Sequence, residues 1–456
     1  MKISEIISKQ RDFFNTYKTK EINFRIDLLK KFKRLIKDNE ELLYSAIYDD
    51  FAKSEFETYL TEISFLYHEV NNFIKNIEKW SKPEKVSTGF TNFPAKSYII
   101  PEPLGVTLVI GAWNYPYQLS LVPAITSLAA GNTVVLKPSE LPENTSKIMA
   151  KLINDNFPPE VFHVIEGGVD ETTEILKHRF DKIFFTGSTK VGKIIYQSAA
   201  KHLTPVTLEL GGKSPCFVFK DADLKMTAKR IVWSKFLNAG QTCVAPDYIL
   251  VEHSIEDEFL KALKVEIEKN YKDVQADADN YLKIINDSNY DRLTKLMDQD
   301  KIFIGGQTQA SERFISPTVL KNITFDDDIM QEEIFGPLLP VLSFTDLYET
   351  ISIVQNKPKP LSCYIYTKNK KTSRKILNEV SFGGGAVNDS LMHLTNINMP
   401  FGGVGHSGFG SYHGKYGFDN FSHKKSILDK PFWYEPPIKY TPYSKLKKKL
   451  VKWLLE

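Results

Sequence analysis

The feature that most constrains the fold is an alternation of short β-branched segments with helical segments between Gly105 and Gly212. The expected strands cover residues 106–112, 133–138, 161–167, 182–187 and 206–212. Helices are expected over 117–130, 144–156, 170–178 and 189–203, with Asn144 and Asp170 at N-cap positions. Strands that alternate with helices form parallel βαβ units in an open sheet. Ligands of such sheets bind at the carboxyl ends of the strands, so the residues that follow each strand are the first candidates for a site.

Helices and a second set of strands flank this region. Residues 2–80 have a helical pattern, with apolar residues at helical spacing at Phe51, Phe56, Tyr59, Leu60 and Ile63. A second α/β region begins near Lys213 with a helix over 222–238. Its strands are expected near 247–252, 313–319, 337–343 and 361–367, before a glycine-rich segment at 381–389.

Two further strand-like segments belong to neither sheet. Residues 96–105 and 422–430 carry prolines and charges, which is typical of edge or protruding strands. They predict a protruding β-ribbon. From the sequence, a ribbon that pairs subunits and a simple surface hairpin are equally good interpretations.

The composition excludes several classes of protein. The 456 residues contain 59 Lys plus Arg and 56 Asp plus Glu, a net charge of +3, which argues against a nucleic-acid-binding protein. No apolar run approaches the ~20 residues that span a bilayer, and the first residues lack a secretory signal pattern. Three cysteines cannot form a disulfide framework, and the nine histidines show no metal-ligand spacing. We therefore expect a cytoplasmic protein without a structural metal.

The segment FFTGSTKVGK (184–193) has the strongest phosphate-binding pattern in the chain. A strand ends at Thr186, a Gly-x-x-x-x-Gly turn follows, and a helix begins, so backbone amides could face a pyrophosphate. The segment nearly matches a P-loop through Gly187, Gly192 and Lys193, but Ile194 stands where a Ser or Thr would hold magnesium. A tight strand-to-helix turn without a ligand is an equally good interpretation.

The segment KPSE (137–140) follows another expected strand. Lys137 and Glu140 could respectively donate to and accept from the hydroxyl pair of a ribose. A solvated turn that begins at Pro138 is the simpler interpretation of these residues alone.

Cys243 is the best candidate nucleophile. It follows Gly240 at the end of a long helix, whereas Cys216 and Cys363 lie within strand-like segments and are expected in the core. No histidine lies at an obvious spacing to serve as its base. Glu209, at the end of an apolar strand, would have a raised pKa and could activate water. Hydrogen bonds from the amides of Gly211 and Gly212 would instead make it a structural carboxylate.

Seven segments occur in an order that resembles the aldehyde dehydrogenase superfamily over about residues 1–435. They are WNYP (113–116), KPSE (137–140), FTGSTKVG (185–192), LELGGKSP (208–215), GQTC (240–243), EEIFGP (332–337) and PFGGVGHSG (400–408). The segments KSEFE (53–57) and SYHGKYGFDNFSHKKS (411–426) are similar to the class 3 branch, which acts on fatty and aromatic aldehydes.

The resemblance implies a role for each matching residue. Cys243 would attack the aldehyde, Asn114 and the Cys243 amide would form the oxyanion hole, and Glu209 would activate water to hydrolyse a thioester. Positions that resemble NAD(P)-binding residues are Trp113, Lys137, Glu140, Gly187, Ser188, Thr189, Lys190, Val191, Gly192, Glu333 and Phe335. By analogy, Tyr115, Trp233 and Leu237 would line an apolar substrate entrance, with Trp233 and Leu237 on one helix face.

The resemblance also implies an α/β fold of two open domains and a bridging arm. A Rossmann-like cofactor domain would comprise residues 1–84 and 104–210, a catalytic domain 211–420, and an oligomerisation arm with the C-terminal tail 85–103 and 421–456. A homodimer is the expected assembly. Glu140 would repel a 2′-phosphate and Lys137 would attract one, so NAD is expected to be preferred and NADP to be usable.

Three other functions fit parts of the sequence. A CoA-acylating aldehyde dehydrogenase would release the acyl group to a thiol, which does not need a water-activating base at Glu209. A P-loop phosphotransferase would use Gly187–Lys193, and Ile194 argues against it. A non-enzymatic relative would not need Cys243, Glu209 and Asn114 together.

The C-terminal segment 444–456 is basic and amphipathic. On a helix, Leu446, Leu450, Trp453 and Leu454 share one face, and the segment is too short to span a bilayer. We expect it to dock on the partner subunit or on its own domain, with peripheral contact to an anionic membrane as the alternative.

Overall fold

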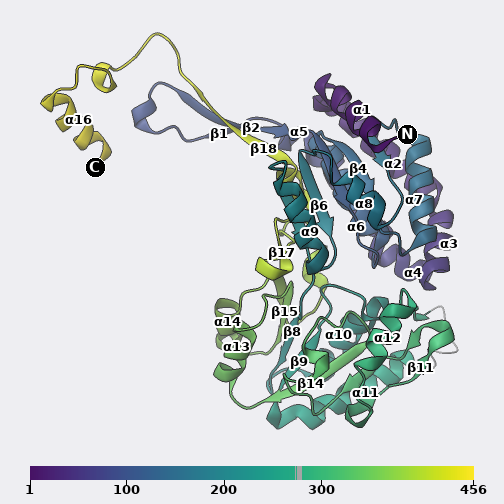
Figure 1. The fold of residues 1–456 in the computed structure, drawn as a ribbon. Coiled ribbons are helices and arrows are strands. Elements are labelled where there is room, and N and C mark those ends of the chain that lie inside the picture. Colours follow the sequence, from purple (N-terminus) through teal and green to yellow (C-terminus); the bar gives the residue numbers. More distant parts are fainter. Residues whose placement is uncertain (273, 275–279) are drawn as a thin grey trace.

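The computed structural model describes residues 1–272, 274 and 280–456. In Figure 1, a first sheet with the N-terminal helices forms the upper half, a second sheet forms the lower half, and an arm projects from the upper half. None of the described helices is long and apolar enough to cross a membrane.

The first sheet has the strand order β17-β7-β6-β3-β4-β5. Its parallel strands are β3 (Val106–Ile110), β4 (Thr133–Lys137), β5 (Phe162–Val164), β6 (Lys182–Thr186) and β7 (Val206–Glu209). The helices between them are α6 (Pro116–Ala130), α7 (Glu143–Asn156), α8 (Val169–Ile175) and α9 (Thr189–Ala200). The strands are almost wholly buried, which is why their sequences are continuously apolar rather than alternating. The predicted parallel α/β sheet is confirmed.

The predicted N-caps at Asn144 and Asp170 are wrong. Helix α7 has Pro142 at its N-cap position, and the carboxylate of Asp50 accepts the amides of Asn144 and Thr145 at 3.1 and 2.8 Å. Helix α8 has Gly168 at its N-cap position. The cap of α7 is therefore supplied by a residue distant in sequence, which a local pattern cannot reveal.

The N-terminal helices pack against the first sheet. They are α1 (Ile3–Asn15), α2 (Ile22–Asp38), α3 (Glu40–Phe51), α4 (Glu55–Thr58) and α5 (Ser64–Trp80), with a π-helical turn over Tyr59–Ile63. Of the apolar residues predicted to share a helical face, Phe51 and Ile63 are buried but Phe56, Tyr59 and Leu60 are exposed. These five residues do not follow one helical period, because α3 ends at Phe51 and the π-helical turn interrupts the 3.6-residue repeat.

The second sheet has the order β10-β13-β14-β9-β8-β15-β16. The strands are β8 (Pro215–Val218), β9 (Tyr248–Glu252), β10 (Ile302–Ile304), β13 (Thr318–Leu320), β14 (Leu338–Phe344), β15 (Ser362–Tyr366) and β16 (Gly384–Val387). All neighbours are parallel except β10 and β13. Its helices are α10 (Leu224–Phe236), α11 (Glu256–Tyr271), α12 (Asp287–Lys295), α13 (Leu347–Gln355) and α14 (Lys370–Glu379).

Two predicted elements of this half differ from the structure. The strand expected over 313–319 is divided into β12 (Phe314–Ile315), which pairs with β11 (Thr308–Gln309), and β13 in the main sheet. The helix expected over 222–238 ends at Phe236, and Asn238 and Ala239 then take left-handed backbone angles.

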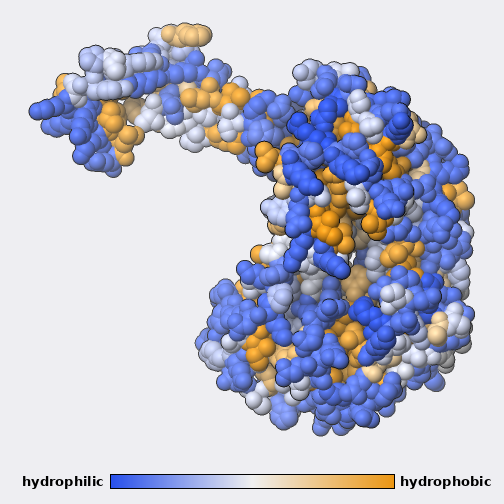
Figure 2. All heavy atoms as spheres, viewed as in Figure 1, coloured by the Kyte–Doolittle hydropathy of each residue, from blue (hydrophilic) through white to orange (hydrophobic). Residues whose placement is uncertain are grey.

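The arm is an antiparallel ribbon of β1 (Glu84–Val86), β2 (Lys96–Pro103) and β18 (Ser422–Asp429). Helix α15 (Gly414–Asn420) leads into β18, and α16 (Lys445–Leu455) follows the ribbon. Leu446 and Trp453 of α16 are both 77% exposed, so this helix does not pack on the body of its own chain. In Figure 2, hydrophobic residues are visible along the arm, where Phe432 and Trp433 are also exposed.

Strand β17 (Gly408–Phe409) joins the two halves, because it pairs with β7 of the first sheet although it comes late in the chain. The segment that follows the second sheet therefore reaches the strand that ends at Glu209.

Candidate active site

One cavity of about 790 Å³ lies at the carboxyl ends of strands β3, β4, β6 and β7 and extends to loops of the second sheet. Its volume is within the ~300–1,000 Å³ of small-molecule sites. Most residues proposed from the sequence line it: Trp113, Asn114, Tyr115, Lys137, Glu140, Gly187, Ser188, Val191, Glu209, Trp233, Leu237, Cys243, Glu333 and Phe335. The fold thus brings together residues more than 200 positions apart in the sequence.

Three proposed cofactor-binding residues, Thr189, Lys190 and Gly192, are not among the described residues that line this cavity. The Thr189 hydroxyl donates to the carbonyl oxygen of His406 at 3.3 Å, and Lys190 is exposed. Gly192 is buried, and a Cβ there would lie 2.8 Å from a methyl group of Leu210. Gly192 therefore allows α9 to pack closely on the sheet.

Cys243 lies after the left-handed turn at Asn238, Ala239 and Gly240, whose φ angles are 56°, 50° and 71°. Glycine is required at 240 because a Cβ would overlap the carbonyl oxygen of Gly336. Burial, with smaller effects from Glu333 and Glu209, raises the pKa of the Cys243 thiol to about 12. In this state the thiol is neutral at pH 7 and needs a base to become a nucleophile.

The other two cysteines lie outside the cavity. Cys216 in β8 and Cys363 in β15 are fully buried between neighbouring strands, as predicted for core residues.

Glu209 ends strand β7 and is 3% exposed. Neither of its carboxyl oxygens has a hydrogen-bond partner among the residues that the structure describes. Burial raises the pKa of Glu209 well above its usual value. The alternative in which the amides of Gly211 and Gly212 hold Glu209 is therefore wrong. A buried, unpartnered carboxyl group that faces a cavity is a site for a proton or a water molecule.

Glu333, and not Glu209, is the carboxylate that contacts the segment of Gly211 and Gly212. Its carboxylate is hydrogen-bonded to the amide of Gly212, and burial raises its pKa to about 8. A Cβ at Gly211 would overlap this carboxylate, so the glycine allows Glu333 to reach the cavity. Phe335, two residues later, packs edge-to-face on Trp113 with ring centroids 5.3 Å apart.

Asn114 and Tyr115 immediately precede helix α6 and contact the Cys243 loop. The side-chain Nδ2 of Asn114 donates to the carbonyl oxygen of Gln241 at 3.0 Å. The Tyr115 hydroxyl is 2.6 Å from the Thr242 hydroxyl. Since an amide nitrogen carries two hydrogens, the second N–H of Asn114 remains available to a ligand.

Lys137 and Glu140 lie at the end of β4. The Nζ of Lys137 donates to the carbonyl oxygen of Pro138 at 2.7 Å and is 3.5 Å from Glu140, which is half-exposed. The lysine is buried although Glu140 is exposed, so a solvated turn describes only the second half of KPSE.

The turn after β6 fits a dinucleotide such as NAD(P). Ser188 is the N-cap of α9, and its hydroxyl accepts the Val191 amide at 3.3 Å. The Thr186 hydroxyl lines the cavity and has no partner among the described residues. A Cβ at Gly187 would lie 2.6 Å from the tip of the Phe185 ring, so any other residue here would have to displace this buried ring. Among the described residues, no cluster of His, Cys, Asp or Glu could hold a metal ion.

The apolar part of the cavity contains residues that sequence reasoning missed. Leu60, Thr61 and Phe65 come from the N-terminal helices, and further lining residues are Met392, Leu394, Phe401, Tyr412 and His413. Trp233 and Leu237 both line the cavity, and Leu237 is the C-cap of α10, where its backbone N–H donates to the carbonyl oxygen of Trp233 one helical turn earlier. Tyr412 and His413 lie within the segment that begins at Ser411, and Leu60 and Thr61 follow KSEFE closely, so these two segments could have indicated them.

Comparison with known proteins gives matches over almost the whole chain. The aldehyde dehydrogenase family matches residues 1–427. The chain is 46% identical to 4,4′-diaponeurosporen-aldehyde dehydrogenase of Staphylococcus aureus, over 94% of each protein. It is 43% identical to a dimeric NADP-preferring aldehyde dehydrogenase of Canis lupus familiaris, over 96% of this chain and 97% of the relative. A solved structure, the substrate-bound state of Staphylococcus aureus AldH, is 44% identical and matches with a TM-score of 0.97 over 100% of both chains.

Proposed function

Because this chain belongs to the aldehyde dehydrogenase family, we propose that it oxidises medium- to long-chain aliphatic or aromatic aldehydes to carboxylic acids with NAD(P), using Cys243 as nucleophile. The match confirms the resemblance predicted from the motifs, and the chain is an oxidoreductase that acts on aldehydes. The P-loop phosphotransferase and the non-enzymatic relative are set aside. The observation that carries the proposal is a single cavity that joins Cys243 to the buried carboxyl of Glu209 and to the strand-end residues Lys137 and Ser188.

In the first step the Cys243 thiol gives up its proton to water in the cavity, and the thiolate sulfur attacks the aldehyde carbon. The carbonyl oxygen gains negative charge and accepts hydrogen bonds from the Cys243 amide and from the free N–H of Asn114. The Asn114 amide is already fixed by its bond to Gln241, so little reorganisation is needed.

Bound NAD(P) would supply the acceptor for the hydride that leaves the aldehyde carbon. Lys137 and Glu140 would hold its adenosine ribose, and Ser188 its pyrophosphate. Glu333 and Phe335 would hold the nicotinamide ribose and orient the ring. Burial lowers the pKa of Lys137, and Glu140 opposes this shift.

The acyl group then remains on Cys243 as a thioester. Glu209 takes a proton from water, and the resulting hydroxide attacks the thioester carbon and releases the acid. Because burial raises the pKa of Glu209, its basic form becomes more populated as the pH rises.

The role of Glu209 in hydrolysis also separates the proposed reaction from that of a CoA-acylating enzyme. Equal amounts of free acid and NADH, formed from an aldehyde and NAD without CoA, would support hydrolysis, whereas a strict need for CoA would refute it.

The apolar lining predicts a preference for longer aldehydes. Leu60, Phe65, Trp233 and Leu237 give a largely hydrophobic entrance, and each buried CH₂ contributes ~0.8 kcal/mol. With partial burial of the chain, kcat/KM for octanal is expected to exceed that for acetaldehyde by at least about 30-fold. A panel of aldehydes from two to ten carbons, assayed at one NAD concentration, measures this. Equal values for acetaldehyde and octanal would contradict the apolar entrance.

Cofactor choice is proposed to depend on Glu140. Its carboxylate would accept from the ribose 2′-hydroxyl of NAD and repel the 2′-phosphate of NADP, so we propose NAD as the preferred cofactor with NADP accepted. Glu140→Gln should raise the ratio of kcat/KM for NADP to that for NAD by about fivefold, the effect of removing ~1 kcal/mol of repulsion. Glu143→Gln, on the exposed first turn of α7, is the control and should leave the ratio unchanged. An unchanged ratio in Glu140→Gln would show that Glu140 does not contact the ribose.

We propose a homodimer in which the arm contacts the partner subunit. The arm projects from the body and exposes Phe90, Phe93, Phe432 and Trp433, and the canine relative is named dimeric. For α16, docking on the partner subunit is the interpretation we retain over peripheral membrane contact. Each of the three cysteines is free, which suits the proposed cytoplasmic location.

A further inference from the structure

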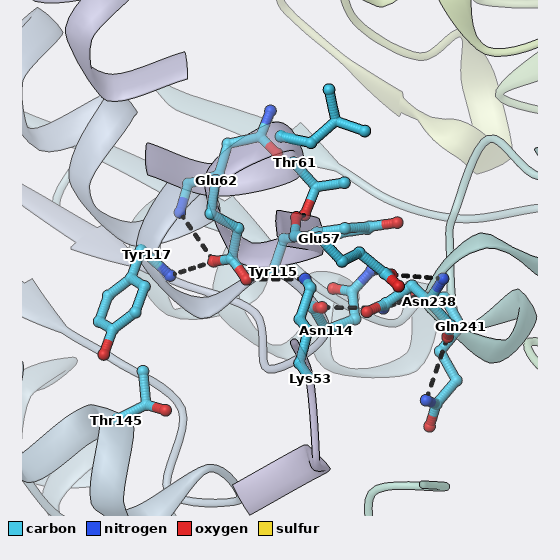
Figure 3. Close-up of polar contacts among 12 residues, drawn as sticks. Lys53, Glu57, Thr61, Glu62, Asn114, Tyr115, Tyr117, Thr145, Asn238 and Gln241 are labelled. Carbon is cyan, nitrogen blue, oxygen red and sulfur yellow. Dashed lines mark hydrogen bonds and ion pairs between the residues drawn. The ribbon is translucent and has the colours of Figure 1, made fainter. Parts of the chain in front are cut away.

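A cluster of charged side chains lies in the segment that joins α3 to α5, close to Asn114 and Tyr115 (Figure 3), and none of its members, Lys53, Glu57 and Glu62, lines the cavity. Lys53 and Glu62 are 1% and 0% exposed, and the Lys53 Nζ is 2.9 Å from a Glu62 carboxylate oxygen. The same Nζ lies 4.4 Å from the centre of the Tyr115 ring. Burial of an ion pair costs desolvation energy, so we expect the buried Lys53–Glu62 pair to have a structural role.

Glu62 fixes the start of helix α6. Its second carboxylate oxygen accepts the backbone amides of Tyr117 and Gln118 at 2.7 and 3.3 Å. These are among the first amides of α6, which lack partners within the helix. Because Asn114 lies just before α6, the carboxylate also fixes the place from which Asn114 enters the cavity. The π-helical turn at Tyr59–Ile63 makes this geometry possible by turning Glu62 inward while Thr61 lines the cavity.

Glu57 contacts the other half of the site. Its carboxylate accepts the backbone N–H of Asn238 at 2.9 Å. Asn238 and the next residue, Ala239, have φ angles of 56° and 50°, a left-handed conformation that is costly for residues other than glycine. Such a turn persists only where surrounding contacts hold it, and Glu57 supplies one of them.

The turn held by Glu57 connects Asn114 to the Cys243 loop. The Asn238 side-chain amide donates to the carbonyl oxygens of Asn114 and Gln241 at 3.0 and 3.1 Å. The Asn114 side-chain amide donates to the same Gln241 oxygen at 3.0 Å. The two proposed donors to the oxyanion, the Asn114 side chain and the Cys243 amide, are thus held in one hydrogen-bond network.

Glu57 is not among the residues that line the cavity. Burial raises the pKa of Glu57, and Lys53 and the Asn238 amide oppose this shift. Its contacts are therefore with the structure that supports the reacting groups and not with substrate.

We propose that Glu57 is a positioning residue: by accepting the Asn238 N–H, it holds the left-handed turn that directs Asn114 and the Cys243 amide toward the same substrate oxygen. This inference rests on the roles given to Asn114 and Cys243 in the proposed function. A misplacement of one donor weakens stabilisation of the oxyanion, so the defect should appear in the chemical step and not in NAD binding.

The test measures NADH formation in a single turnover, with enzyme in excess over octanal and with saturating NAD. Glu57→Ala removes the acceptor and is expected to lower the first-turnover rate constant at least about 10-fold. Glu57→Gln keeps an acceptor oxygen and should stay within about threefold of wild type. Glu55→Ala, on the exposed side of the same short helix, is the control and should match wild type. Octanal limits the amplitude under these conditions, so folding is measured separately by far-UV circular dichroism, and a wild-type spectrum of Glu57→Ala would exclude unfolding as the cause of a lower rate constant.

A double substitution tests whether Glu57 acts through the groups that bind the oxyanion. Because Glu57 is proposed to orient both oxyanion donors, Glu57→Ala should slow Asn114→Ala by less than it slows the wild type, since one of the two donors is already absent. An unchanged rate constant in Glu57→Ala, or full additivity with Asn114→Ala, would overturn the inference. A wild-type enzyme that forms no NADH from aldehyde would instead refute the proposed function.

Discussion

Replacement of Cys243 by alanine is expected to abolish both steady-state oxidation and the first turnover of NADH, by at least about 10⁴-fold. Hydride cannot leave until the aldehyde carbon is tetrahedral, and Cys243 is the group proposed to make it so. NAD should still bind, because the residues proposed to hold it lie on the first sheet and on the loop at Glu333. Rapid-mixing absorbance at the NADH band measures the first turnover, and a fluorescence titration measures the Kd for NAD.

The other two cysteines provide matched controls. Cys216→Ala and Cys363→Ala should retain most activity, because both thiols are buried between strands and away from the cavity. Each is expected to cost about 1–2 kcal/mol of stability through lost packing, which a denaturant titration would detect. First-turnover NADH in Cys243→Ala at the wild-type rate would exclude this thiol as the nucleophile.

The parallel sheet could be predicted from the sequence because buried strands leave a local signal. The segments at 106–110, 133–137 and 182–186 are continuously apolar, and each is followed by a polar turn and a helix. Elements that depend on distant contacts could not be predicted in this way. The cap of α7 comes from Asp50, about 90 positions away, and the π-helical turn at Tyr59–Ile63 follows no simple period.

The candidate site also combines residues that a local sequence pattern predicts with contacts that only the fold creates. Glu209 and Lys137 end strands β7 and β4, and Cys243 follows the end of a helix, so their local context indicated them. The environment that defines their chemistry did not appear in that context. Glu333, not Glu209, accepts the Gly212 amide, and only the fold shows that Glu209 has no partner among the described residues. Glu57 and Glu62 lie in an N-terminal segment far from Cys243 in sequence, and tertiary structure alone brings them to it.

In Glu209→Gln, we expect oxidation of the aldehyde to proceed and hydrolysis of the thioester to stop. Glutamine has nearly the size and shape of glutamate, and burial disfavours the charged form of Glu209 by raising its pKa, so the variant should fold normally. Glutamine cannot take a proton from water, so the acyl group should stay on Cys243 after hydride transfer.

We therefore expect Glu209→Gln to form about one NADH per active site at nearly the wild-type rate and then to stall. Mass spectrometry of the quenched protein should find an acyl adduct on the peptide that contains Cys243. A slower first turnover would assign Glu209 a second role in taking the Cys243 proton, which is consistent with its effect on the thiol pKa. Wild-type steady-state turnover in Glu209→Gln would show that another group activates the water. Glu333, whose pKa burial raises to about 8 and which also lines the cavity, would then be the next residue to substitute.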